Sequence, residues 1–245
     1  RIDNKDRKII QLGALLYARS MEELEKCLSV IEMEEEIKSE IVDAVEEYNE
    51  DEKVGIDLVV TVPDGSEISA VVAAQAEEAI AAVDDDPYIS KSIDDIVIKL
   101  GTGNYTIAEP IENANGSVRI LGEGKNTKVD ASTIAEGAII SLNAPDATTA
   151  PRRALTKKDD YTYIEKVSIE DVVLTGVKGS LIYDNGVKTC VNNLTISNAQ
   201  IELATEAVDF QSIIAFQGGG VKDFTIKNST VYNTTDTYAK YFIRY

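Results

Sequence analysis

Three segments decide the fold: Val167-Ser-Ile-Glu-Asp-Val-Val-Leu174, Leu194-Thr-Ile-Ser-Asn-Ala-Gln-Ile201 and Phe224-Thr-Ile-Lys-Asn-Ser-Thr-Val231. Each segment has eight residues and begins with an apolar residue, a Ser or Thr and an Ile. The fifth residue is Asp or Asn, the eighth is apolar, and the fourth, sixth and seventh vary. Equivalent positions in successive segments lie 27 and 30 residues apart. A period near this length, built from short β-rich runs, is typical of a β-solenoid in which each repeat forms one coil.

A second set of short apolar runs interleaves with these segments. Its equivalent positions, Ile140, Ile182, Ile214 and Ile243, are separated by 42, 32 and 29 residues. Each cycle therefore contributes at least two strands before the chain returns. We expect residues 93–245 to form a parallel β-helix of about four to five coils. The second inward stack would be formed by Ile182, Ile214 and Ile243.

The repeated segments also predict the inside and one corner of each coil. The isoleucines that the segments share would stack inward, one above another; they are Ile169, Ile196 and Ile226. Their shared Asp or Asn would stack at a bend, because Asn tolerates left-handed backbone and its amide can bond along the stack. An antiparallel β-sandwich also has many short strands. It would not require one residue class at the same corner three times.

The front of the chain has a different pattern. Residues 1–53 carry apolar residues at helical spacing and predict a small acidic helical region, which precedes a β-helix domain over 54–245. Val54–Val62 alternates and is rich in Val and Ile, which predicts a strand. The Ala-rich run over about 66–83 predicts a helix.

Composition excludes several classes of function. The formal net charge is −19, and such an acidic chain repels phosphate backbones, so we expect no nucleic-acid partner. There is no His, which removes Ser–His triads and His-ligated metals. The two cysteines, 163 residues apart, make no metal site, and we expect no metal and no cofactor. No apolar run is long enough to span a membrane, and no signal segment opens this chain.

The stretches Ile93–Ile107 and Ser117–Val129 resemble the opening coil of right-handed β-helix proteins of the pectate-lyase-like superfamily. The stretch Asn192–Tyr245 is more similar to uncharacterised β-helix domains of gut-bacterial surface lipoproteins. The resemblance implies a mainly β, right-handed parallel β-helix (solenoid) preceded by a small α-helical N-terminal region. It also implies that Glu67–Val83 caps the N-terminal end, and that the protein is extracellular or on the outer cell surface.

The chemistry of that superfamily does not carry over. Its lyases use an Arg-x-Pro-x-x-Arg motif, whereas Pro151-Arg-Arg153 has Pro and Arg in the wrong order. Its polygalacturonases use a His, which this chain lacks. A pair of carboxylates could still hydrolyse a glycoside, but no pair is identifiable here. A protein without catalytic activity that binds or presents carbohydrate is therefore expected. The alternatives are a polysaccharide-degrading enzyme with an unrecognised carboxylate site and a purely structural or adhesive protein.

A candidate carbohydrate site lies around the polar segment 143–160. Its basic residues would meet acidic glycans, and its aromatic residues would stack on sugar rings. The predicted site residues are Arg152, Arg153, Tyr161, Tyr163 and Tyr183. Phe242 and Ile243 lie in the last predicted strand, where a bare coil exposes apolar side chains and strand edges. End-to-end homo-association through that coil is therefore expected.

Overall fold

The structure is a computed structural model, and it describes residues 54–83, 89–113, 116–134, 138–142, 162–184, 189–204, 212–216, 220–233 and 241–244. The helices predicted over 1–53 lie outside these residues. The chain divides into two compact units, residues 1–55 with 82–92 and residues 56–81 with 93–245. The coils described below belong to the second unit.

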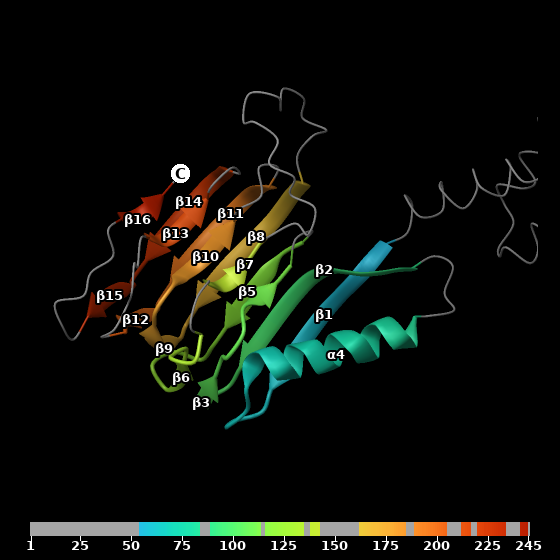
Figure 1. Ribbon diagram of the computed structural model, residues 1–245, viewed down its shortest axis with the longest axis horizontal. Coiled ribbons are helices and arrows are strands. Elements are labelled where there is room, and N and C mark those ends of the chain that lie inside the picture. The colour runs from blue at the N-terminus through green and yellow to red at the C-terminus, as the bar shows by residue number, and fades with distance from the viewer. Residues whose placement is uncertain are drawn as a thin grey trace, which may run out of the picture. The chain divides into compact units, whose positions relative to one another are not determined.

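Sixteen described strands are arranged in three sheets (Figure 1). Sheet A has the order β1 (Val54–Val62), β2 (Ile89–Leu100), β5 (Val118–Leu121), β8 (Thr162–Glu170), β11 (Thr189–Ser197), β14 (Gly220–Lys227). Sheet B has the order β3 (Gly103–Thr106), β6 (Thr127–Asp130), β9 (Val173–Val177), β12 (Gln200–Leu203), β15 (Thr230–Asn233). Sheet C has the order β4 (Ile111–Glu112), β7 (Ala138–Ser141), β10 (Ser180–Asp184), β13 (Ser212–Phe216), β16 (Tyr241–Arg244).

From β2 onward the chain visits the sheets in the fixed order A, B, C, and it does so five times. Each strand pairs in parallel with the strand one coil before it, as in the pairs β8–β11 and β11–β14. This topology is a parallel β-helix, and it confirms the predicted mainly β solenoid.

The isoleucines predicted as one stack are aligned in register along sheet A. Ile196 is opposite Ile169 on one side and Ile226 on the other. The same column continues through Ile120 and Ile98 of the first two coils. Ile169 and Ile196 are fully buried, whereas Ile226 is 40% exposed, because β14 has a strand neighbour on only one side among the described residues. Ile226 nevertheless lines the same apolar pocket as the buried Ile196, so its register and its inward direction are as predicted.

The second predicted stack is also aligned, since Ile182 pairs with Ile140 and with Ile214, and Ile214 pairs with Ile243. The first three of these isoleucines are buried. All five residues of β13 are buried, so neither face of this strand is open to solvent.

The predicted polar corner is confirmed between sheets A and B. Asp171, Asn198 and Asn228 have φ values of 57°, 51° and 51°, in the left-handed region that Asn and Asp tolerate. The Asn198 amide donates to Asp171 Oδ1 at 2.9 Å, and the Asn228 amide donates to Asn198 Oδ1 at 3.2 Å. These bonds fix the register of three successive coils at their exposed edge.

Helix α4 (Ile68–Ala82) lies beside β1 and β2 (Figure 1). Its buried residues, Ile68 and Val72, join the same apolar cluster as Val60 of β1 and Ile98 of β2. This end of the solenoid is therefore covered by apolar side chains of the helix.

The N-terminus of α4 is fixed to the first coil by Glu67. Its carboxylate accepts hydrogen bonds from the backbone amides of Ser69 at 3.1 Å and Ala70 at 2.6 Å, which is N-cap geometry. It also accepts from the amide of Ala108, in the first coil, at 2.8 Å. Burial alone would raise the pKa of Glu67. The Ser69 hydroxyl and the three backbone amides outweigh that effect and lower it below 4.5.

We expect Glu67→Gln to lower the free energy of unfolding by about 1 kcal/mol at neutral pH, because a neutral amide accepts these bonds less strongly. Since the pKa of Glu67 is lowered by folding, the stabilisation is complete above 4.5 and is lost as the pH falls through the lowered value. Urea unfolding of both proteins checks this. An equal difference between them at neutral and at strongly acidic pH would contradict the role of the carboxylate.

Candidate functional site

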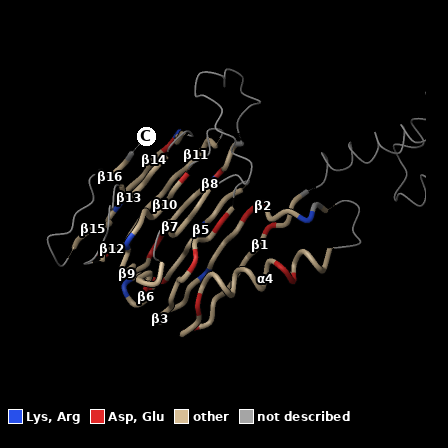
Figure 2. The backbone as a smooth tube through the Cα atoms, in the orientation of Figure 1, with Lys and Arg blue, Asp and Glu red and all other residues tan. Residues whose placement is uncertain are grey.

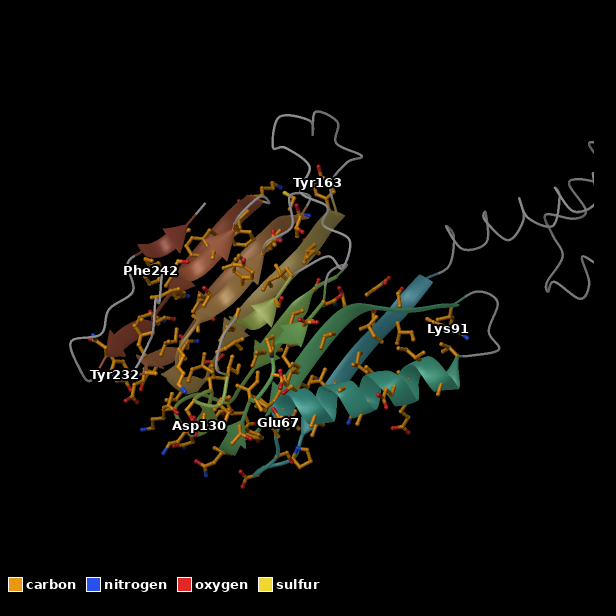
Figure 3. All side chains as sticks on the ribbon, viewed as in Figure 1. Glu67, Lys91, Asp130, Tyr163, Tyr232 and Phe242 are labelled. Carbon is orange, nitrogen blue, oxygen red and sulfur yellow. The ribbon has the colours of Figure 1, made fainter. Side chains whose placement is uncertain are left out.

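The structure describes two of the five predicted site residues. Tyr163 is the second residue of β8 in sheet A, and its side chain is 44% exposed (Figure 3). Tyr183 is half-buried in β10 of sheet C, with Ser141 and Ala215 as its strand neighbours. The two tyrosines therefore lie on different sheets. Arg152, Arg153 and Tyr161 lie outside the described residues.

A polar outer surface continues from Tyr163 across sheet A. We call it the polar face, and it consists of Tyr163, Glu165, Lys166, Glu170, Asn192, Asn193, Thr195, Ser197, Lys222, Asp223, Thr225 and Lys227. The residues between them in β8 and β11, such as Ile164, Val167 and Leu194, are fully buried. Its charged residues lie on β8 and β14 (Figure 2), whereas β11 between them carries only uncharged residues. The polar face is thus a flat array of hydrogen-bonding groups.

Glu165 is held in place on the polar face by two amides of the next coil. The side chain of Asn192 donates to Oε2 at 2.8 Å, and that of Asn193 donates to Oε1 at 3.0 Å. Both carboxylate oxygens are therefore bound while Glu165 itself stays exposed. Because the carboxylate of Glu165 is exposed and each of its oxygens can accept more than one hydrogen bond, it can also accept from the hydroxyl groups of a ligand.

Glu170 forms a second bonded group on the same face. Its carboxylate lies 3.2 Å from Lys166 Nζ and accepts a hydrogen bond from the Ser197 hydroxyl at 3.2 Å. Burial raises the pKa of Glu170, but the polar groups of Ser168, Lys166 and Ser197 and the charge of Lys166 lower it overall. Glu170 is therefore ionised at neutral pH.

Neither Glu67 nor Glu170 has the raised pKa of a general acid. A glycosidase acid needs a raised pKa so that it stays protonated, whereas the pKa values of Glu67 and Glu170 are both lowered. Among the described residues, no group of three or more His, Cys, Asp or Glu side chains is placed to hold a metal ion. Within the same residues, no helix is long and apolar enough to cross a membrane.

The last coil contains an apolar pocket of about 470 Å³. The buried side chains of Ile196 and Ile201 form its floor, and Ile226, Tyr232 and Phe242 form its rim. These three rim residues are 40%, 38% and 42% exposed. The sequence indicated an exposed last coil but not a pocket, because the pocket depends on how three sheets converge.

A family model described as "Domain of unknown function (DUF4957)" matches residues 103–234, which is more than half of the chain. Neither the curated proteins nor the solved structures gave a match.

Proposed function

Because the chain belongs to the family described as Domain of unknown function (DUF4957), which carries no assigned activity, we propose its function from the surface of its coils. The proposed function is that of a rigid β-helix without catalytic activity that binds or presents carbohydrate. The single observation that carries this proposal is the polar face, on which an exposed tyrosine precedes rows of amides, hydroxyls and ion-paired carboxylates.

The chemistry of the polar face fits a sugar chain. Sugar rings stack on aromatic side chains, and their hydroxyls bond to amides and carboxylates. Successive strands of a sheet are spaced by about 4.8 Å, so a linear glycan lying across the strands meets a new row of polar groups at each coil. Tyr163 marks one end of this path, and the predicted basic residues Arg152 and Arg153 would extend it for acidic glycans.

The cellular setting is part of the proposal. We place the protein outside the cell or on its outer surface, as a member of the pectate-lyase-like superfamily related to surface lipoprotein domains, on the resemblance of its coils. End-to-end association through the last coil also belongs to the proposal. The apolar pocket and its exposed rim support it, because such surfaces favour burial against another chain.

A glycan array tests the proposal, with pectins and host glycans as the panel. If a glycan binds, Tyr163→Ala should lower the binding affinity about five- to tenfold, because a stacked aromatic ring contributes roughly 1 kcal/mol or more to binding. Tyr232→Ala is the matched control, since Tyr232 is similarly exposed but lies away from the polar face. The double variant Arg152→Ala, Arg153→Ala should lower the affinity for acidic glycans and reduce the salt dependence of their binding.

The same panel distinguishes a binding protein from an enzyme. We expect neither new reducing ends nor unsaturated sugars after prolonged incubation. Release of either product would favour the polysaccharide-degrading alternative. Binding that survives Tyr163→Ala and the double arginine change, but is lost in Tyr183→Ala, would place the site on sheet C.

A further inference from the structure

Arg119 lies on the outer surface of sheet A, at the border of the polar face. Its two neighbours in β5 are buried, whereas Arg119 itself is half-buried. In register it lies between Val97 of β2 and Ser168 of β8, and the same row continues through Thr195 and Thr225. Because β5 has a strand on each side, the surroundings of Arg119 do not depend on the ends of the solenoid.

The guanidinium of Arg119 has no acid partner on this surface. Its Nε atom is buried and has no hydrogen-bond partner, and none of the salt bridges among the described residues includes Arg119. A buried donor without a partner costs free energy. The half-buried side chains of Val97 and Leu121 lie beside it, so its surroundings are partly apolar. Arg119 therefore holds a positive charge that the described chain does not neutralise.

The charged side chains on the neighbouring strand are already bound to each other. Lys166 and Glu170 lie four residues apart on the same face of β8, and Lys166 Nζ is 3.2 Å from Glu170 Oε1. Ser168 lies between them in the strand and is fully buried. Glu170 also accepts a hydrogen bond from the Ser197 hydroxyl. These contacts occupy Glu170 and leave Arg119 without a counter-charge.

We propose that Arg119 binds the anionic group of an acidic sugar, a carboxylate or a sulfate ester, in a glycan that lies on the polar face. This inference rests on the proposed function and adds the class of glycan. A planar guanidinium can donate two parallel hydrogen bonds to an oxyanion, and such charge-assisted bonds are stronger than bonds between neutral groups. Lys99 is exposed on β2 opposite Leu121 and adds a second positive charge beside the site.

The net charge of −19 does not prevent this contact. At physiological ionic strength, exposed charges further apart than about 8 Å are largely screened from each other. A bound anion would instead touch the guanidinium directly, in surroundings where Val97 and Leu121 exclude part of the water. Since low local polarity strengthens such a bond, the site favours an acidic sugar over a neutral one of the same shape.

Two matched pairs of glycans separate the two kinds of anion. Hyaluronan oligosaccharides differ from their methyl esters in the charge of the carboxyl group, and keratan sulfate oligosaccharides differ from their desulfated form in the sulfate ester. We expect the acidic member of at least one pair to bind the full chain about tenfold more tightly than its neutral form. The pair that shows this preference identifies the anion.

Three variants assign the preference to the guanidinium. It should be lost in Arg119→Gln and kept only in part in Arg119→Lys, which retains the charge but not the planar fork. Lys128→Gln is the matched control, because it removes one positive charge from the exposed surface of sheet B and should leave the preference unchanged. Urea unfolding of each variant shows whether its coils are intact.

The guanidinium can also be observed in the unaltered chain. Its nuclear magnetic resonance signals, assigned by their absence in Arg119→Gln or Arg119→Lys, should shift on titration with the acidic glycan and not with its neutral form. Equal affinity for both members of each pair, a preference that survives Arg119→Gln, or an equal loss in Lys128→Gln would overturn this inference while the proposed function stands. The absence of binding by every glycan would overturn both.

Discussion

Ile196→Asp is expected to abolish cooperative folding of the coils. Ile196 is buried between Ile169 and Ile226 in the central column of sheet A, and its neighbours there are apolar. An aspartate at this position would be either an ion without a partner or a neutral acid without its hydrogen bonds, and either state costs several kcal/mol. This is a large fraction of the stability of an ordinary domain. We expect loss of the cooperative thermal transition, followed by circular dichroism.

Thr195→Asp is the matched control for this change. It introduces the same charge one residue away on the same strand, but its side chain lies on the polar face and is half-exposed. We expect a change of about 0.5 kcal/mol or less, as for most surface substitutions. Equal melting temperatures for Ile196→Asp and the original chain would show that residue 196 is not in the core.

Gly122→Ala is also expected to lower the free energy of unfolding of the coils. Gly122 follows β5 at the A–B corner, where its amide donates to the Glu170 carbonyl at 2.9 Å. A Cβ atom there would lie 2.2 Å from the carbonyl oxygen of Asp171 and 2.6 Å from Val172 Cγ1. Backbone of the next coil would have to move, and such overpacking costs about 2–3 kcal/mol. Urea unfolding measures the loss.

Gly220→Ala is the control, because it replaces a glycine by alanine without creating a steric clash. A Cβ atom at Gly220, at the start of the edge strand β14, meets no atom within 4 Å. This variant should unfold within about 0.5 kcal/mol of the original chain. A Gly122→Ala protein as stable as the Gly220→Ala protein would mean that the coils are not packed this closely at the corner.

The corner and the register of the last three coils were predictable because they depend on local chemistry. Only a few residue types adopt left-handed backbone, so Asp171, Asn198 and Asn228 identify the corner by themselves. The Asp or Asn pattern does not identify the corner of the second coil. Its corner contains Gly124, with φ of 95°, and glycine supplies the same backbone freedom without an Asn side chain.

The polar face was predictable in part. A period of 27 residues places Asn192 beside Glu165, so the carboxylate–amide bond could have been expected from the repeat. The predicted site was instead the segment 143–160, because its basic residues stand out in an acidic chain. The exposure of Ile226 could not be predicted from its segment, which has the same pattern as that of Ile196, because exposure depends on which strands lie next to it in the sheet.

Chemical-shift mapping with a bound glycan tests the central claim that the polar face is the binding surface. The account predicts that amide shifts on titration concentrate on Tyr163, Asn192 and Thr195 and their neighbours on the outer surface of sheet A. Shifts concentrated instead at the apolar pocket around Ile201 and Tyr232, or no binding by any glycan of the panel, would contradict it.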